Sequence, residues 1–396
     1  MKENTRRDFL KKMGMGAVPL LLPSMGLDAA TLTDKKEDKT KKSERVNFIF
    51  DGILYPPINY IDKLKEIHVQ TPIRHDFYGH GGATKALEET FAKLTGKEKA
   101  IYVPTGTMAN QLAIKLLNGN NTKIIVPENS HVYRDEADAA QSVHNKRLIP
   151  VGKGKPYYEL KDLIDTINYL DNEEVFKSGL GTVMIENPVR RADGAFVPFE
   201  TIKEISAWCR KNGYKLHLDG SRLHIAAAYA NVTVAEYASQ FDTVYISLYK
   251  YLNAAGGAML CGDATIIDQM EHEIKILGGT MFQTWTNTAM ALHYVKDIDE
   301  KWQKIIVATK ALMAELNKTE GVSVTEQKNG TNIYYMKVNG VNREKLANFL
   351  YEKHNMLIGE EDNGTIMLIV NESILFRSTQ ELAKAWKEGI ETSRIK

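Results

Sequence analysis

The sequence predicts an α/β fold in which helices cover both faces of a mainly parallel sheet, followed by a small C-terminal α+β domain. Segments with strand character alternate with segments of helical periodicity from residue 99 to about residue 300, and this alternation is typical of β-α-β units. From Val322 onward short strands and helices follow one another in a second pattern with its own apolar positions. With 396 residues, 43% of them hydrophobic, the chain is long enough for two cores.

The large domain is expected at residues 46–300, beginning with a short apolar arm at 46–53. A helix follows the glycine-rich loop 76–82, with Thr84 as its expected cap and Gly96 as its stop. Strands are then expected at 99–104, 123–127, 148–151, 181–186, 214–218 and 243–247. Helices are expected at 157–170, 199–211, 264–277 and 287–316, the last long enough to connect two domains.

The C-terminal domain is expected at residues 301–396, including the end of that connecting helix. Its strands are predicted at 332–338, 356–358 and 365–370, and its helices at 343–354 and 379–392. Such a mixture of elements is typical of an α+β domain.

The first 45 residues are predicted to lie outside the folded domains. A paired-arginine segment at 5–12 precedes the apolar run 13–22 and small residues near 28–30, which resembles a twin-arginine export signal at residues 1–30. Residues 31–45 are rich in lysine and are expected to be a solvated linker. The prediction is therefore a periplasmic or otherwise exported protein that uses the twin-arginine translocation machinery; the alternative for the first segment is an amphipathic basic helix.

Composition excludes several classes of protein. The formal net charge of +1 argues against general attraction to nucleic acid. No apolar run of the mature portion approaches the length of a membrane span. Cys209 and Cys261, the only cysteines, fall in an expected helix and an expected core strand, so neither a disulfide framework nor a metal site is predicted.

The strongest chemical signal is a carboxylate and a lysine at the ends of two expected strands. Asp219 follows the strand 214–218, and Lys250 follows the strand 243–247. A lysine that forms a Schiff base with pyridoxal 5'-phosphate and an aspartate that pairs with its ring nitrogen are the groups such a cofactor requires. Each residue alone is more often a turn or a solvated strand end.

Other strand ends supply complementary groups at the same predicted edge. Thr105, Gly106 and Thr107 lie between a strand and a helix start, where backbone N–H groups can hold a phosphate, although an ordinary N-cap is the alternative. His131 follows the next strand and is predicted to stack on the cofactor ring, the alternative being a structural histidine. Asn187 follows a further strand and is expected to contact the cofactor.

These residues resemble the threonine aldolase family of fold type I pyridoxal phosphate enzymes, within the wider group of β-eliminating lyases. The resemblance covers nearly the whole mature chain. Its matching stretches are 78–79, 94–98, 104–110, 130–131, 186–187, 217–222, 247–262 and 331–332. The resemblance implies a fold type I architecture and a homodimer or homotetramer whose active sites are completed across a subunit interface.

The resemblance also implies roles for single residues. It assigns ring stacking to His131, the pyridinium contact to Asp219, the substrate carboxylate to Arg222 and the Schiff base to Lys250. Ser247 is expected to contact the phosphate, because the serine that the family has directly before its lysine is replaced here by Tyr249.

The substrate side departs from the family. Pro188 and Val189 replace residues that include a histidine near the substrate hydroxyl, and Met367 stands where several members have an arginine. The acidic loop of the family becomes the segment 78–82. Losing polar partners of this kind alters substrate discrimination by about 10⁴-fold or more. His80, His224, Arg190 and Arg191 are the candidates to replace them.

The function expected from the resemblance is cleavage of a β-hydroxy-α-amino acid, L-threonine or L-allo-threonine, to glycine and an aldehyde. His131 or a bound water is the expected base. The first alternative keeps the cofactor and changes the reaction, to β-elimination or another conversion of an amino acid. The second is a non-catalytic exported binding protein.

Overall fold

The computed structural model describes residues 44–359, 361–362 and 364–395, and these residues divide into two compact units. One unit contains residues 61–298 and 329–331, and the other contains the described residues up to Tyr60, residues 299–328 and the described residues from 332 to 395. Strand β1 (Val46–Asn47) pairs in parallel with β11 (Met356–Leu357). This pairing places the N-terminal arm in the C-terminal unit, which corrects the expectation that the arm belongs to the large domain. The expected export signal and most of the linker lie outside the described residues.

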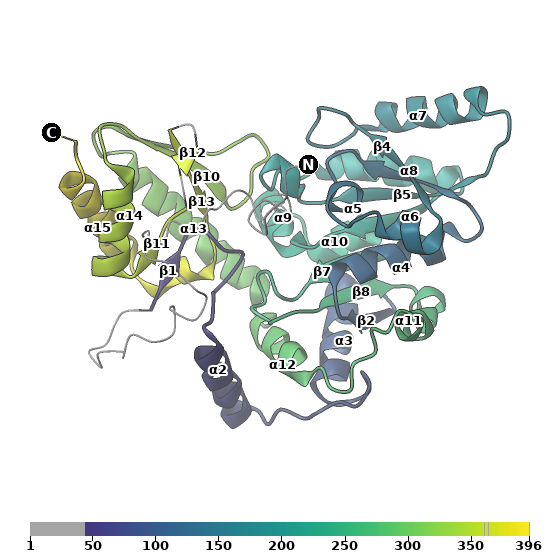
Figure 1. The fold of residues 1–396 in the computed structure, drawn as a ribbon, viewed down its shortest axis with the longest axis horizontal. Coiled ribbons are helices and arrows are strands. Elements are labelled where there is room, and N and C mark those ends of the chain that lie inside the picture. Colours follow the sequence, from purple (N-terminus) through teal and green to yellow (C-terminus); the bar gives the residue numbers. More distant parts are fainter. Residues whose placement is uncertain (1–43, 360, 363, 396) are drawn as a thin grey trace, which may run out of the picture. The chain divides into compact units, whose positions relative to one another are not determined.

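The larger unit is built on a seven-stranded sheet (Figure 1). In spatial order its strands are β2 (Lys99–Val103), β8 (Ala258–Gly262), β7 (Thr243–Ser247), β6 (Lys215–Asp219), β5 (Leu180–Glu186), β3 (Lys123–Pro127) and β4 (Arg147–Val151). Only β8 runs antiparallel to its neighbours. The predicted mainly parallel sheet is confirmed. Parallel order means that the carboxyl ends of six strands meet at one edge.

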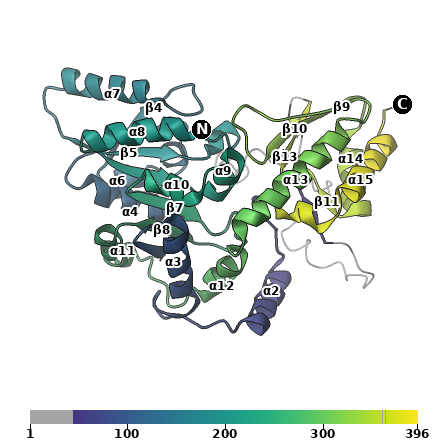
Figure 2. The ribbon, with the colours of Figure 1, turned by 180° about the vertical axis from the view of Figure 1, so that it is seen from behind.

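Helices cover both faces of this sheet. One face carries α4 (Gly106–Asn118), α6 (Ala139–His144) and α11 (Ala264–Ile276), whose apolar residues form two buried clusters with the strands. The view from behind shows α3 (Gly82–Thr95), α8 (Phe199–Lys211) and α10 (Val234–Ser239) over the opposite face (Figure 2). A sheet buried on both faces explains why its strands read as continuous apolar runs.

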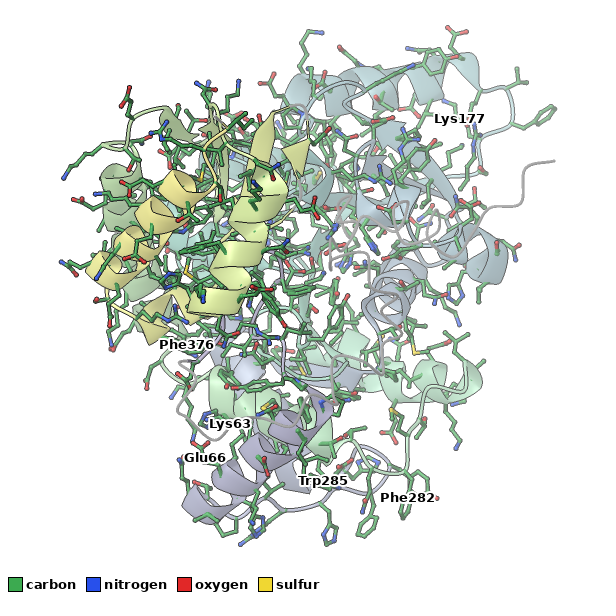
Figure 3. All side chains as sticks on the ribbon, turned by 60° about the vertical axis from the view of Figure 1, so that its left-hand side comes forward. Lys63, Glu66, Lys177, Phe282, Trp285 and Phe376 are labelled. Carbon is green, nitrogen blue, oxygen red and sulfur yellow. The ribbon has the colours of Figure 1, made fainter. Side chains whose placement is uncertain are left out.

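Further helices complete the larger unit. These are α5 (His131–Arg134), α7 (Leu160–Glu173), a 3-10 turn at Arg190–Ala192, α9 (Leu223–Ala230) and α12 (Trp285–Tyr294). Helix α2 (Pro57–Gln70) extends across the boundary between the units. Its ion pair between Lys63 Nζ and Glu66 Oε1, at 3.0 Å, joins neighbouring turns on its surface (Figure 3).

Two expectations about helices were wrong. Helix α3 has Gly81 as its N-cap, and Thr84 lies inside it, where its buried hydroxyl is 2.8 Å from that of Thr284. The helix expected at 287–316 is two helices, α12 and α13 (Ile298–Leu316), separated at residues 295–297, where Asp297 adopts a φ of 53°. A left-handed residue cannot continue a right-handed helix.

The C-terminal unit contains a four-stranded antiparallel sheet. Its order is β12 (Glu361–Asp362), β13 (Thr365–Ile369), β10 (Ile333–Val338) and β9 (Val322–Thr325). Helices α13, α14 (Arg343–His354) and α15 (Thr379–Thr392) belong to this unit, with a 3-10 turn at Glu372–Phe376. Trp386 is fully buried and packs edge-on against Phe48, with ring centroids 6.0 Å apart. Among the described residues, no helix combines the length and apolar character that crossing a membrane requires.

Candidate active site

The predicted site residues lie at the carboxyl edge of the larger sheet. Asp219 ends β6, where it pairs in register with Glu186 of β5 and Tyr245 of β7. The backbone N–H of Asn187 donates to the carbonyl of Asp219 at 3.0 Å, and the N–H of Gly220 donates to the carbonyl of Tyr245 at 3.0 Å. The segments that leave three adjacent strands are therefore fixed to one another by backbone hydrogen bonds.

Two buried carboxylates stand side by side at this edge. Asp219 and Glu186 are each only 2% exposed. Glu186 accepts hydrogen bonds from the backbone N–H groups of His131, at 2.6 Å, and Arg190, at 2.8 Å. Burial, followed by repulsion from Asp219, raises the pKa of Glu186 to about 7. Glu186 thus joins the loops after β3 and β5, while Asp219 accepts from the side-chain amide of Asn110 at 3.1 Å and from the backbone N–H of Ser221 at 3.2 Å.

His131 is oriented by a third carboxylate. Its Nδ1 lies 3.0 Å from Oε1 of Glu136, a residue that is 5% exposed. Burial opposes a charge on the ring, but the hydrogen bond and the negative charges of Glu136, Asp219 and Glu186 outweigh it and raise the pKa of His131. A carboxylate accepts only, so in the neutral ring the proton lies on Nδ1 and the lone pair on Nε2.

The predicted phosphate cradle is the N-terminus of α4. Thr105 is its N-cap, with Oγ1 accepting from the N–H of Met108 at 3.2 Å, so the expected alternative role is present as well. A Cβ at Gly106 would lie 2.1 Å from the hydroxyl oxygen of Tyr245, which leaves room only for glycine. Ser247, which is 3% exposed, has a hydroxyl without a hydrogen-bond partner among the described residues.

Strand β8 brings this helix start close to the lysine segment. In register, Ala258 of β8 pairs with Val103 on one side and with Ser247 on the other. Thr105 lies two residues after the end of β2, with Gly106 and Thr107 next to it, and Lys250 lies three residues after the end of β7. Lys250 is 9% exposed, and its Nζ lies 5.5 Å from the ring centroid of Tyr249.

Arg222 also lies at this edge. It is 9% exposed and immediately precedes α9, three residues after Asp219. The turn between them is fixed because the N–H of Ser221 donates to Oδ1 of Asp219 at 3.2 Å. All nine predicted site residues are therefore at one edge of the sheet; their individual chemical roles stay predictions.

The candidate replacements on the substrate side have other environments. His80 is exposed and lies 3.0 Å from Glu271. His224 is buried, which lowers its pKa to about 4 and keeps it neutral. Arg191 forms a bidentate ion pair with Asp135, at 2.8 and 2.5 Å.

Sequence reasoning missed four polar residues of this edge. They are Asn110, Glu136, Glu186 and His217, all buried. Glu186 stood next to a predicted residue without being assigned a role. Asn110 lies in a helix, Glu136 in a loop and His217 in a strand. The local sequence pattern of these segments does not show that their polar side chains contact one another. No group of three or more potential metal ligands occurs in the described part of the chain.

The sequence is similar to those of several known proteins. The low-specificity L-threonine aldolase of Candida albicans is 31% identical over 220 residues, covering 55% of this chain and 58% of that protein. The alanine racemase TOXG of Cochliobolus carbonum is 32% identical over 252 residues, covering 63% of this chain and 62% of that protein. The chain thus spans less than two thirds of the length of these curated relatives.

Solved structures show the same fold. A putative L-allo-threonine aldolase from Listeria monocytogenes matches with a TM-score of 0.71 at 21% identity, covering 88% of this chain and 97% of that one. A serine palmitoyltransferase from Sphingomonas wittichii matches with a TM-score of 0.60 at 15% identity, over 88% of this chain and 87% of that one. The predicted fold class is confirmed. Because the family model for β-eliminating lyases matches residues 62–339, more than half of the sequence, the chain belongs to the β-eliminating lyase family.

Proposed function

We propose that this protein is a pyridoxal phosphate-dependent lyase that cleaves a β-hydroxy-α-amino acid, L-threonine or L-allo-threonine, to glycine and an aldehyde. The observation that carries the proposal is the buried carboxylate of Asp219 at the same sheet edge as Lys250 and the start of α4. The names of the relatives, low-specificity L-threonine aldolases, support the choice of reaction.

The residues present fit this cofactor. The N-terminus of α4 offers backbone N–H groups to a phosphate, and Gly106 has no side chain to block them. The hydroxyl of Ser247, buried without a partner among the described residues, is a donor for the same phosphate. Asp219 supplies the negative charge that a protonated ring nitrogen needs, and Lys250 supplies the amine that binds the aldehyde carbon.

Each side chain has a defined task in the proposed reaction. When bound, the cofactor accepts the electron pair released as the bond between the α and β carbons breaks. Arg222 binds the substrate carboxylate, and His131 accepts the proton of the β-hydroxyl at Nε2, because its Nδ1–H is held by Glu136. The raised pKa of His131 makes it a stronger base. The α carbon takes up one proton for the one that the β-hydroxyl gave to His131, so the cleavage balances, and the aldehyde and glycine leave.

A product assay tests the proposal. Purified, cofactor-loaded protein is incubated with L-threonine and with L-allo-threonine, and glycine and acetaldehyde are expected in equal amounts. Ammonia with a keto acid would instead indicate β-elimination, and a change of configuration at the α carbon would indicate racemisation. Absence of turnover with every amino acid would refute an enzymatic function.

A second candidate reaction is removal of the α hydrogen without cleavage of the carbon-carbon bond. Two observations favour it. One relative carries the name alanine racemase. The segment that replaces the family's histidine has a buried Val189, which offers no polar group to a β-hydroxyl. Alanine is therefore included in the assay, and formation of the opposite enantiomer would favour this candidate.

Export and oligomerisation belong to the same proposal. The paired arginines at 6 and 7, followed by an apolar run, support export through the twin-arginine machinery to the periplasm. Replacing both by lysine in the full chain is expected to keep the precursor in the cytoplasm, as judged by cell fractionation. Export of the doubly substituted chain at the original level would contradict it.

An exposed aromatic cluster supports a homodimer or homotetramer. Phe77, Tyr78 and Phe282 are 48, 54 and 57% exposed, with ring centroids 5.3 to 5.5 Å apart where they contact (Figure 3 labels Phe282). Exposed apolar patches of this kind often mark protein interfaces. Phe282→Asp is expected to lower the molar mass measured by light scattering. A wild-type protein that is monomeric at all concentrations would refute the oligomer.

A further inference from the structure

Asn110 of α4 is fully buried and makes three hydrogen bonds at the proposed site. Its Nδ2 lies 2.9 Å from Oε1 of Glu136 and 3.1 Å from Oδ2 of Asp219. Its Oδ1 lies 3.0 Å from Nε2 of His217. The amide of Asn110 therefore donates one hydrogen to each of two carboxylates, and its oxygen accepts from an imidazole. Both N–H donors of the amide are satisfied.

The two carboxylates determine how this amide points. Turning it over would place Oδ1 of Asn110 against the oxygens of Glu136 and Asp219, which have no proton to offer when ionised. With Oδ1 facing His217, the ring must donate from Nε2, and its Nδ1 then accepts from the hydroxyl of Thr243 at 2.8 Å. Burial lowers the pKa of His217 to about 4, in keeping with a neutral ring that has one proton.

The same oxygen of Glu136 that accepts from Asn110 also accepts from Nδ1 of His131. A continuous path of hydrogen bonds thus runs from His217 through Asn110 to Asp219 on one branch and to His131 on the other. We propose that Asn110, held in one orientation by His217, is a positioning residue that sets the ring-nitrogen contact and the ring-face contact of the cofactor together. This inference rests on the proposed cofactor site.

Asn110 donates a charge-assisted hydrogen bond to Asp219 from α4, so this bond does not depend on the loop after β6. Without Asn110, Oδ2 of Asp219 loses this donor, while Oδ1 keeps the backbone N–H of Ser221. Hydrogen bonds to charged groups contribute enough that Asn110→Leu is expected to weaken pyridoxal phosphate binding by at least about ten-fold. Because the electrostatics of Asp219 change with the loss of this donor, the pH dependence of the visible absorbance of the loaded protein is expected to differ from that of the wild type.

The chain offers a matched control on the same helix. Asn118 is the last residue of α4 and is 1% exposed. Its Nδ2 donates at 2.5 Å to the carbonyl of Asn121, in the loop that follows the helix. Asn118→Leu removes a buried amide of the same size and is expected to lower the melting temperature without changing cofactor affinity. Asn110→Leu and Asn118→Leu are compared by titrating the apoprotein with pyridoxal phosphate, by pH titration of the visible band and by thermal unfolding.

A second variant tests the path itself. His217→Phe keeps a ring of similar volume but removes the donor to Asn110, so it is expected to weaken binding in the same direction as Asn110→Leu. If His217 acts through Asn110, the double variant binds no more weakly than Asn110→Leu alone. Additive losses would overturn the positioning role, and so would Asn110→Leu and His217→Phe proteins that bind and titrate like the Asn118→Leu control. Should Asn110→Leu fail to fold, wild-type affinity in His217→Phe overturns the role.

These outcomes separate the two proposals. A wild-type protein that binds pyridoxal phosphate while Asn110→Leu binds it equally well refutes only the role of Asn110. A wild-type protein that neither binds the cofactor nor shows a visible band refutes the proposed function, and the role of Asn110 with it.

Discussion

Gly106→Ala tests whether the start of α4 and strand β7 are in contact as closely as the structure shows. The added Cβ would lie 2.1 Å from the hydroxyl oxygen of Tyr245 and 2.5 Å from its Cζ. Tyr245 is 3% exposed and belongs to a buried cluster with residues of α4 and α11, so its ring has no open space to enter. Overpacking of this kind lowers the free energy of unfolding by about 1 to 3 kcal/mol. Because two contacts are this short, the loss in Gly106→Ala is expected to be about 3 kcal/mol.

Urea unfolding of the apoprotein measures this loss directly, and for a unit of this size about 3 kcal/mol corresponds to a melting temperature lower by roughly 6 to 12 °C. The helix start must also move, so pyridoxal phosphate affinity is expected to fall. Gly256→Ala is the control for stability, because its Cβ would meet only Asn287 Nδ2, at 3.8 Å. Tyr245→Leu is expected to restore part of the loss in a double variant with Gly106→Ala. A Gly106→Ala protein as stable as Gly256→Ala would refute the close contact.

Three further predictions concern single interactions. Thr105→Ala and Ser378→Ala each remove an N-cap, so each is expected to lower the free energy of unfolding in urea by about 1 kcal/mol. Only Thr105→Ala is expected to weaken pyridoxal phosphate binding. Equal cofactor affinity in the two variants would show that Thr105 caps the helix but does not bind the cofactor. Because the pKa of Glu186 is raised to about 7, its contribution to apoprotein stability is fully present below its unfolded pKa and is lost as the pH rises through 7. Glu186→Gln is expected to flatten this part of the curve of unfolding free energy against pH. An unchanged curve would contradict the raised pKa. Arg191→Ala leaves Asp135 buried without its bidentate partner and is expected to cost about 1 to 3 kcal/mol in urea unfolding, whereas a loss below about 0.5 kcal/mol would show that solvent reaches Asp135.

The parts of the fold that were predictable are those whose local pattern agrees with their tertiary role. The strands of the larger sheet are buried on both faces, so their apolar runs were visible in the sequence. The break between α12 and α13 was not predictable, because the helical pattern continues through residues 295–297 and only the left-handed backbone at Asp297 interrupts it.

For the site, the sequence revealed residues at strand ends but not the residues that hold them. Asp219 is the last residue of β6 and Lys250 lies three residues after the end of β7, so their placement followed from the order of the chain. Asn110 lies on a helix, and its partners are supplied by a loop at Glu136 and a strand at His217. Contacts between elements so far apart in sequence leave no local pattern, and only the folded arrangement shows them.

The antiparallel strand β8 has a consequence for how the protein is made. Strand β2 emerges early from the ribosome, but as an edge strand it has a single neighbour, and that neighbour ends at Gly262, opposite Lys99. Until β8 has been synthesised, the backbone groups of β2 have no partner in the sheet, and the helix start that follows it has no fixed position relative to Ser247. Loading of a phosphate-bearing cofactor must therefore wait until almost all of the larger unit has been translated.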